Sequence, residues 1–142
     1  MGSRLFLDSY DSLFSKEHTF QINFDMISGD KKNQNRVEYV KSYGALPPKK
    51  ISGTLDSFIH QAAHQENLNV KGFKNLSGAH TDSIPFHLRK YERVDFATFN
   101  ASKYSHSKED TQDKVNSVIL LNTCKFVARI IINLDKNFKI SC

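Results

Sequence analysis

The sequence predicts an α+β fold in which an antiparallel β-sheet carries one principal helix on one face. Three observations lead to this prediction. Polar and apolar residues alternate over residues 18–27, an amphipathic helical pattern covers residues 54–67, and residues 115–140 hold the densest apolar content. A chain of 142 residues suits one domain. We therefore expect residues 1–142 to form a single domain, with a possible internal boundary at residues 44–50.

The clearest predicted strand is residues 18–27. Its apolar side chains occupy every second position from Phe20 to Met26, which is typical of a strand with one buried and one solvated face. Residues 36–43 follow after a polar loop and predict the partner strand of a hairpin. Pro47 and Pro48 then end any strand, because proline lacks a backbone N–H and restricts the preceding residue.

The C-terminal half is predicted to complete the antiparallel sheet. Its Val- and Ile-rich runs suit a pleated, half-buried surface. We expect strands at residues 93–100, 117–121, 126–134 and 138–141. A helix over residues 113–122 is a competing interpretation, because the apolar positions there also fit helical spacing.

The principal helix is predicted over residues 54–67. Thr54 is the expected N-cap, with Ser57 as the alternative. His60 and His64 lie four residues apart on one face, which is metal-ligand spacing and resembles the HExxH motif of zinc peptidases. Gln61 stands where the hydrolytic glutamate of that motif would be. We therefore treat the pair as a weak metal candidate and favour two partly exposed histidines beside an apolar stripe.

Charge and composition narrow the function classes. The formal net charge is +5, and the excess lies in residues 71–142, where twelve Lys/Arg face seven Asp/Glu. Such a field attracts an anionic partner. No apolar run reaches the roughly 18 residues of a membrane span, and no signal-peptide core is recognised. Two cysteines outside any CxxC pair predict neither a zinc knuckle nor a disulfide framework.

Basic and aromatic residues interleave in the second half of the chain. Between Lys71 and Lys108 there are seven Lys/Arg and three acidic residues. Cations that follow phosphates, together with rings that stack on bases, are what single-stranded nucleic acid needs. This pattern predicts RNA binding by five residues, namely Lys90, Tyr91, Lys103, Tyr104 and His106.

Residues 75–80 (NLSGAH), followed by Phe86 and a β-rich C-terminus, resemble the ribonuclease tip domains of bacterial polymorphic and contact-dependent toxins. The resemblance implies metal-independent RNA cleavage without a cofactor. It also implies an acidic immunity or inhibitor protein as partner, and the cytoplasm as the site of action.

The chemistry of such a cleavage needs a base, an acid and a cation beside the phosphate. His80 is the candidate base, and His87 or His106 the candidate acid. Arg89 or Arg93 would hold the phosphate, while Thr81 or Tyr91 would donate a hydrogen bond to it. The alternative function is a non-enzymatic protein-binding module, of viral or effector type, that docks an acidic partner.

Overall fold

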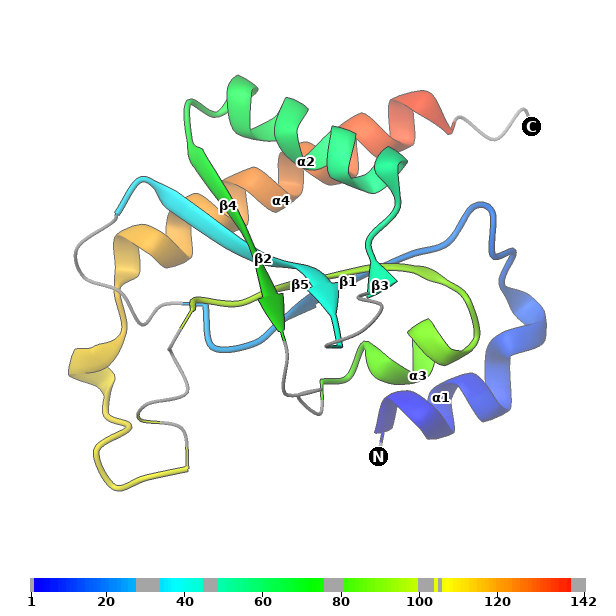
Figure 1. Ribbon diagram of the computed structural model, residues 1–142, viewed down its shortest axis with the longest axis horizontal. Coiled ribbons are helices and arrows are strands. Elements are labelled where there is room, and N and C mark those ends of the chain that lie inside the picture. The colour runs from blue at the N-terminus through cyan, green and yellow to red at the C-terminus, as the bar shows by residue number, and fades with distance from the viewer. Residues whose placement is uncertain are drawn as a thin grey trace.

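A mixed β-sheet forms the centre of the computed structural model, which describes residues 2–27, 34–44, 49–75, 81–99, 104 and 106–138 (Figure 1). The sheet has five strands in the order β1-β5-β2-β3, and β4 also pairs with β2. The strands are β1 (Phe20–Phe24), β2 (Arg36–Tyr43), β3 (Lys49–Lys50), β4 (Asn69–Asn75) and β5 (Glu92–Phe96).

The two longest strand pairings are parallel. β1 runs parallel to β5, from Phe20 opposite Glu92 to Phe24 opposite Phe96. β2 runs parallel to β4, and its antiparallel contacts are shorter, with β3 and through one pair with β5. The predicted antiparallel sheet is therefore wrong, as is the predicted hairpin between residues 18–27 and 36–43, because β5 inserts between those strands. A helix connects β2 to β4, as a parallel crossover requires.

Helices cover the sheet and make the fold α/β, and not the predicted α+β. In Figure 1 α2 and α4 lie together on one side of the sheet, and α1 and α3 lie together on the other. The helices are α1 (Gly2–Tyr10), α2 (Gly53–Gln65), α3 (Ile84–Leu88) and α4 (Ser117–Asn137), with 3₁₀ turns at Asp11–Leu13 and Gln112–Lys114.

The predicted principal helix is confirmed as α2, with a different start. The cap is Ser52, whose Oγ accepts a hydrogen bond from the Leu55 backbone N–H at 3.1 Å, and not Thr54 or Ser57. Leu55 and Ile59 are fully buried against the sheet and α4.

The predicted strands at residues 117–121 and 126–134 are wrong, because α4 runs through both. Residues 139–141 of the last predicted strand lie outside the described residues. Asn116 caps the helix by accepting hydrogen bonds from the backbone N–H groups of Val118 and Ile119. The buried positions then recur every three or four residues, which only a helix presents on one face: Ile119, Thr123, Phe126, Val127, Ile130, Asn133 and Leu134.

α4 is also long and apolar enough to cross a membrane by length and composition alone. Packing accounts for one side of this helix. Phe126 and Ile130 are fully buried, and Arg129 pairs with Glu66 of the α2 C-terminus at 2.7 Å. The other side exposes apolar residues such as Leu121 and Ile131, and 39% of the apolar window is buried.

The burial difference between two neighbouring isoleucines of α4 tests this packing. Ile130 is fully buried, whereas Ile131 is 54% exposed. Replacing Ile130 with Ala is expected to lower the free energy of unfolding by about 2–5 kcal/mol, because it removes apolar contacts and leaves a cavity. Ile131→Ala is the matched control, with a change within about 0.5 kcal/mol. Urea denaturation of both variants gives the comparison, and equal losses would contradict the packing.

Candidate functional site

A buried carboxylate organises the polar interior of the sheet. Asp95 of β5 is 1% exposed. One of its oxygens accepts hydrogen bonds from the Tyr43 hydroxyl, from Ser83 Oγ at 2.6 Å and from Arg93 Nη1 at 2.9 Å. The other accepts one from Asn23 Nδ2 at 2.8 Å. These donors come from β1, β2, β5 and the segment before α3, so the carboxylate fixes four parts of the chain at one point.

Arg93 is held beside this carboxylate from several sides. Its Nη1 also donates to Ser83 Oγ at 2.7 Å, and its guanidinium carbon lies 3.8 Å from the centre of the Tyr43 ring. Burial raises the pKa of the Tyr43 hydroxyl, and the neighbouring Asp95 raises it further. Tyr43 therefore stays a hydrogen-bond donor to Asp95 at neutral pH.

A second aspartate lies at the end of the neighbouring strand. Asp25 follows β1, and its backbone N–H donates to the Phe96 carbonyl at 3.0 Å. Burial raises the pKa of the Asp25 carboxyl, the charges of Asp95 and Asp82 raise it further, and His106 lowers it. We call Asp25, Asp82 and Asp95 the acidic cluster. Asp25 lies at the end of β1, Asp82 in the segment before α3, and Asp95 in β5. The charge of His106 acts on Asp25 of this cluster.

The acidic cluster favours a bound cation. Three carboxylates within electrostatic range repel one another, and a positive group placed among them would relieve this repulsion. Carboxyl groups with raised pKa values also mark many functional sites, because catalysis and binding often need such groups. The cluster stands out in a chain whose net charge is positive.

Metal-ligand geometry is incomplete in the part of the chain that the structure describes. There, no group of three or more His, Cys, Asp or Glu side chains is placed to hold a metal ion. His60 and His64 of α2 fit this result, because His60 is 58% exposed and lies 4.0 Å from Asp56, which is one helical turn away. The predicted weak metal candidate gains no third ligand from the described residues.

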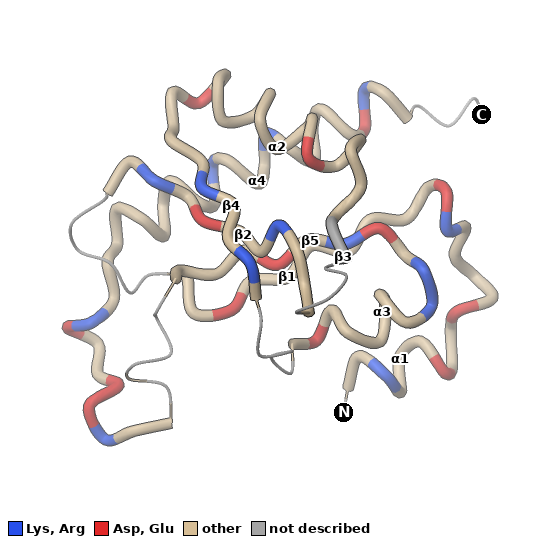
Figure 2. Tube along the Cα trace, viewed as in Figure 1, with Lys and Arg blue, Asp and Glu red and all other residues tan. Residues whose placement is uncertain are grey.

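The residues predicted to bind a phosphate are paired within the protein. Arg89 forms ion pairs with Asp8 and Asp11, and Arg93 is paired with Asp95. Tyr91 is 4% exposed and donates to Asp11 Oδ1 at 2.7 Å, so its ring is covered. Figure 2 shows acidic residues near basic ones in several parts of the described chain.

The structure brings some of the other predicted site residues together. His87 and Lys90 line one cavity with Tyr91 and Arg93, whereas Tyr104 and His106 do not line it. Thr81 lies 2.7 Å from Ser83 Oγ, and His87 and Lys90 lie at and just after the end of α3. His106 faces the acidic cluster. Tyr104 is 5.6 Å from the Lys114 Nζ atom, measured to the ring centre. His80 and Lys103 lie outside the described residues.

Sequence reasoning missed all three members of the acidic cluster. The strand predicted over residues 18–27 places Asp25 on its solvated face. Asp95 sits inside a strand whose five residues include Arg93, so it resembled ordinary surface charge. A usable signal was present, since Asp95 lies between Val94 and Phe96, and charged residues are seldom buried unless they are paired.

A stability measurement tests the acidic cluster. Because the pKa of Asp25 is raised in the folded protein, its charged form is less favourable there than in the unfolded chain. Asp25→Asn is therefore expected to raise the free energy of unfolding at pH 7. The gain should disappear at a pH below the ordinary carboxyl value of 3.8, where Asp25 is protonated in both states.

Urea denaturation at the two pH values gives this comparison. The control is Asp135→Asn, which removes the same charge from an exposed position on α4 and should show no such pH-dependent gain. If Asp25→Asn were less stable than the wild type at pH 7, the carboxyl would be stabilised in the fold and the cluster as described would be wrong.

Comparisons with known proteins identify the fold. The chain matches Peptidase family M28 over residues 1–131. The crystal structure of the LapA aminopeptidase of Legionella pneumophila is similar with a TM-score of 0.72 and 16% identity, over 94% of this chain and 35% of that one. The glutaminyl cyclase of an Acidobacteriales bacterium is similar with a TM-score of 0.66 and 22% identity, over 96% of this chain and 46% of that one. No curated protein matches the chain.

These findings overturn the predicted ribonuclease toxin. The resemblance to toxin tip domains rested on residues 75–80, of which only Asn75 lies within the described residues, whereas the family match extends over residues 1–131. The chain spans less than half the length of the two solved structures. The chain belongs to peptidase family M28.

Proposed function

We propose that this chain forms the part of an aminopeptidase-type site that binds the free amino end of a peptide. The single observation that carries the proposal is the acidic cluster, in which the raised pKa of Asp25 reflects burial beside two further carboxylates. An α-amino group has an ordinary pKa of about 7.7–8.0, so it is mostly an ammonium ion at pH 7. Such a group supplies the positive charge that the cluster favours.

The position of the cluster supports this proposal. Asp25 follows β1 at the edge where the parallel strands β1 and β5 end. In open α/β sheets, ligands bind outside the carboxyl ends of the strands. Exposed apolar side chains stand at the same edge, with Phe24 44% and Met26 40% exposed. They offer a surface for the side chain of the first peptide residue.

A metallopeptidase family implies a bound metal ion, which would activate a water molecule for attack on the peptide bond. Asp25 and His106 are of the right chemical type for zinc. The described residues do not supply a complete ligand set, since no three such groups meet there. The proposal therefore concerns binding and orientation of the peptide amine by the acidic cluster, and no hydrolytic step is assigned to these residues.

Binding of two small amides tests the proposal. Leucinamide carries the free ammonium group, and N-acetyl-leucinamide has the same side chain without the charge. We expect leucinamide to bind with a Kd of about 1 mM and the acetylated amide to bind at least about tenfold more weakly. Isothermal titration calorimetry at pH 7 gives both values.

Two variants test whether Asp25 itself, and not the overall charge of the protein, is needed to bind the amine. Asp25→Asn is expected to weaken leucinamide binding by roughly tenfold or more, because hydrogen bonds to charged groups contribute about 1.5–3 kcal/mol. Asp135→Asn should bind leucinamide like the wild type. Equal affinity for the two amides, or unchanged binding in Asp25→Asn, would refute the proposal.

A glutaminyl cyclase-type function is the second candidate. The solved glutaminyl cyclase shares more sequence with this chain than the aminopeptidase does, 22% against 16% identity. This function predicts that glutaminamide binds more tightly than leucinamide to the same cluster. Mass spectrometry would then detect loss of ammonia from a glutaminyl peptide incubated with the protein, whereas an aminopeptidase would release the first residue.

Binding of RNA, or of an acidic inhibitor protein, stays a prediction from charge alone. The ion pairs of Arg89 and Arg93 reduce the free positive charge on which that prediction depended.

A further inference from the structure

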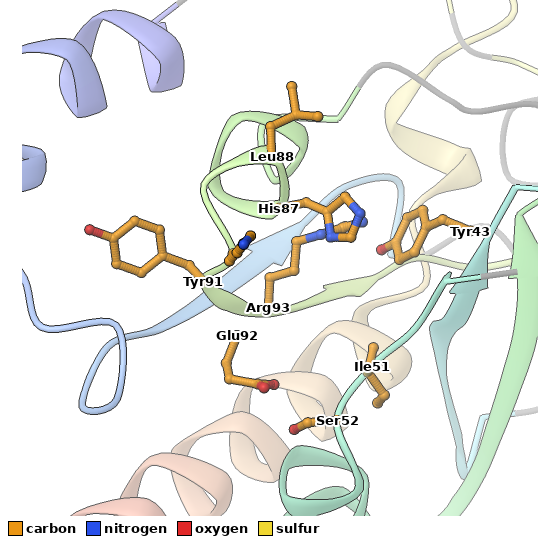
Figure 3. A pocket seen from close by; sticks show the side chains of 9 residues that line it. Tyr43, Ile51, Ser52, His87, Leu88, Tyr91, Glu92 and Arg93 are labelled. Atoms are coloured by element: carbon orange, nitrogen blue, oxygen red, sulfur yellow. The ribbon is translucent and has the colours of Figure 1, made fainter.

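A cavity lies at the opposite end of β5 from Asp25. It has a volume of about 380 Å³, and residues 90–93 form one wall. Tyr43, at the end of β2, and Ile51, just before α2, form the facing wall, and His87 closes it from α3 (Figure 3). Asp95, a member of the acidic cluster, pairs with Arg93 of the cavity wall. None of the three cluster aspartates lines the cavity itself.

Arg93 gives this cavity a fixed cationic group. The side chain is 5% exposed and lines the cavity. Its bonds to Ser83 and Asp95 both leave from Nη1, and the Tyr43 ring covers one face of the guanidinium. The Nε atom is buried and has no hydrogen-bond partner among the described residues. The guanidinium is therefore held in one orientation on the cavity wall, and one of its buried donors lacks a partner in the described part of the chain.

The charges on the cavity wall favour a ligand that carries a single negative charge. Lys90 and Arg93 contribute two positive charges and Glu92 one negative charge, so the wall carries about one net positive charge with His87 neutral. Asp95 lies behind Arg93 and offsets part of its charge. A polyphosphate would exceed this charge, whereas a monocarboxylate matches it.

The backbone of Lys90, which lines the cavity, has an unusual conformation. Lys90 has φ of +66°, a left-handed conformation that costs a non-glycine residue free energy. Its N–H donates to the His87 carbonyl at 2.9 Å, and Lys90 is one of the residues that line the cavity. Strained backbone of this kind is common where a side chain must be held at a ligand.

The rest of the wall is mixed. Ile51 and Leu88 are apolar and Tyr43 adds a ring, whereas Ser52 and His87 are polar. Leu88 is 72% exposed. We propose that this cavity binds a small monocarboxylate with an apolar body, such as an aromatic or branched-chain acid, with its carboxylate toward Arg93 and Lys90. This binding is independent of the amine site proposed at the acidic cluster.

Benzoate is the probe that tests this inference, and benzamide is its uncharged control of the same shape. In ¹H–¹⁵N NMR spectra of the full chain, benzoate is expected to shift the amide signals of residues 90–93 and to saturate near about 1 mM. Benzamide should bind at least about fivefold more weakly. Equal binding of the two, shifts that do not saturate, or shifts confined to residues around Asp25 would overturn the inference.

Two variants test the cationic groups separately. Lys90→Gly removes one charge at a position whose φ suits glycine, so it should fold at least as well and weaken benzoate binding by about two- to fivefold. Lys125→Gln removes the same charge from the exposed side of α4 and should bind like the wild type. Arg93→Lys keeps the charge but loses the planar fork, and should weaken binding by about tenfold. Wild-type affinity in a folded Lys90→Gly protein would overturn the inference.

Discussion

The buried carboxylate of Asp95 is the constraint on which the interior of this domain depends. A charge in a protein interior is unfavourable unless it is paired and hydrogen-bonded. Asp95 meets this requirement with Arg93, Tyr43, Ser83 and Asn23, which come from different strands and from the segment before α3. These hydrogen bonds join β1, β2 and β5 to the segment before α3 at one point.

The same carboxylate separates two regions of opposite charge. On one side lies the acidic cluster, where Asp95 helps to raise the pKa of Asp25. On the other side lies the cavity lined by Arg93 and Lys90. The amine-binding and carboxylate-binding proposals therefore place ligands of opposite charge at the two ends of β5, and each can be tested without the other.

Two packed helices, α2 and α4, supply eight of the twelve buried residues of the described hydrophobic core. α2 and α4 bury Ile59 and Ile130 in one core with Val94 of β5. Polar pairs at their contact, Arg129 with Glu66 and Asn133 with Gln65, fix how the helices meet. The charged residues of the sheet's other side are paired in a similar way, because Arg89 reaches Asp8 of α1.

The sequence alone determined those helices and strands whose apolar residues recur with a single clear period. The alternation around Phe20–Phe24 predicted β1, and the stripe through Leu55 and Ile59 predicted α2, since each pattern matches one period. α4 was misread because Leu121 and Ile131 are exposed as well as apolar, which hides the helical period of its buried face. Strand order and direction depend on contacts distant in the chain, such as Asn23 with Asp95, and no local pattern contains them. The candidate site was missed for the same reason. Asp25, Asp82 and Asp95 are ordinary charges in the sequence, and only the tertiary structure brings them within electrostatic range and buries Asp95.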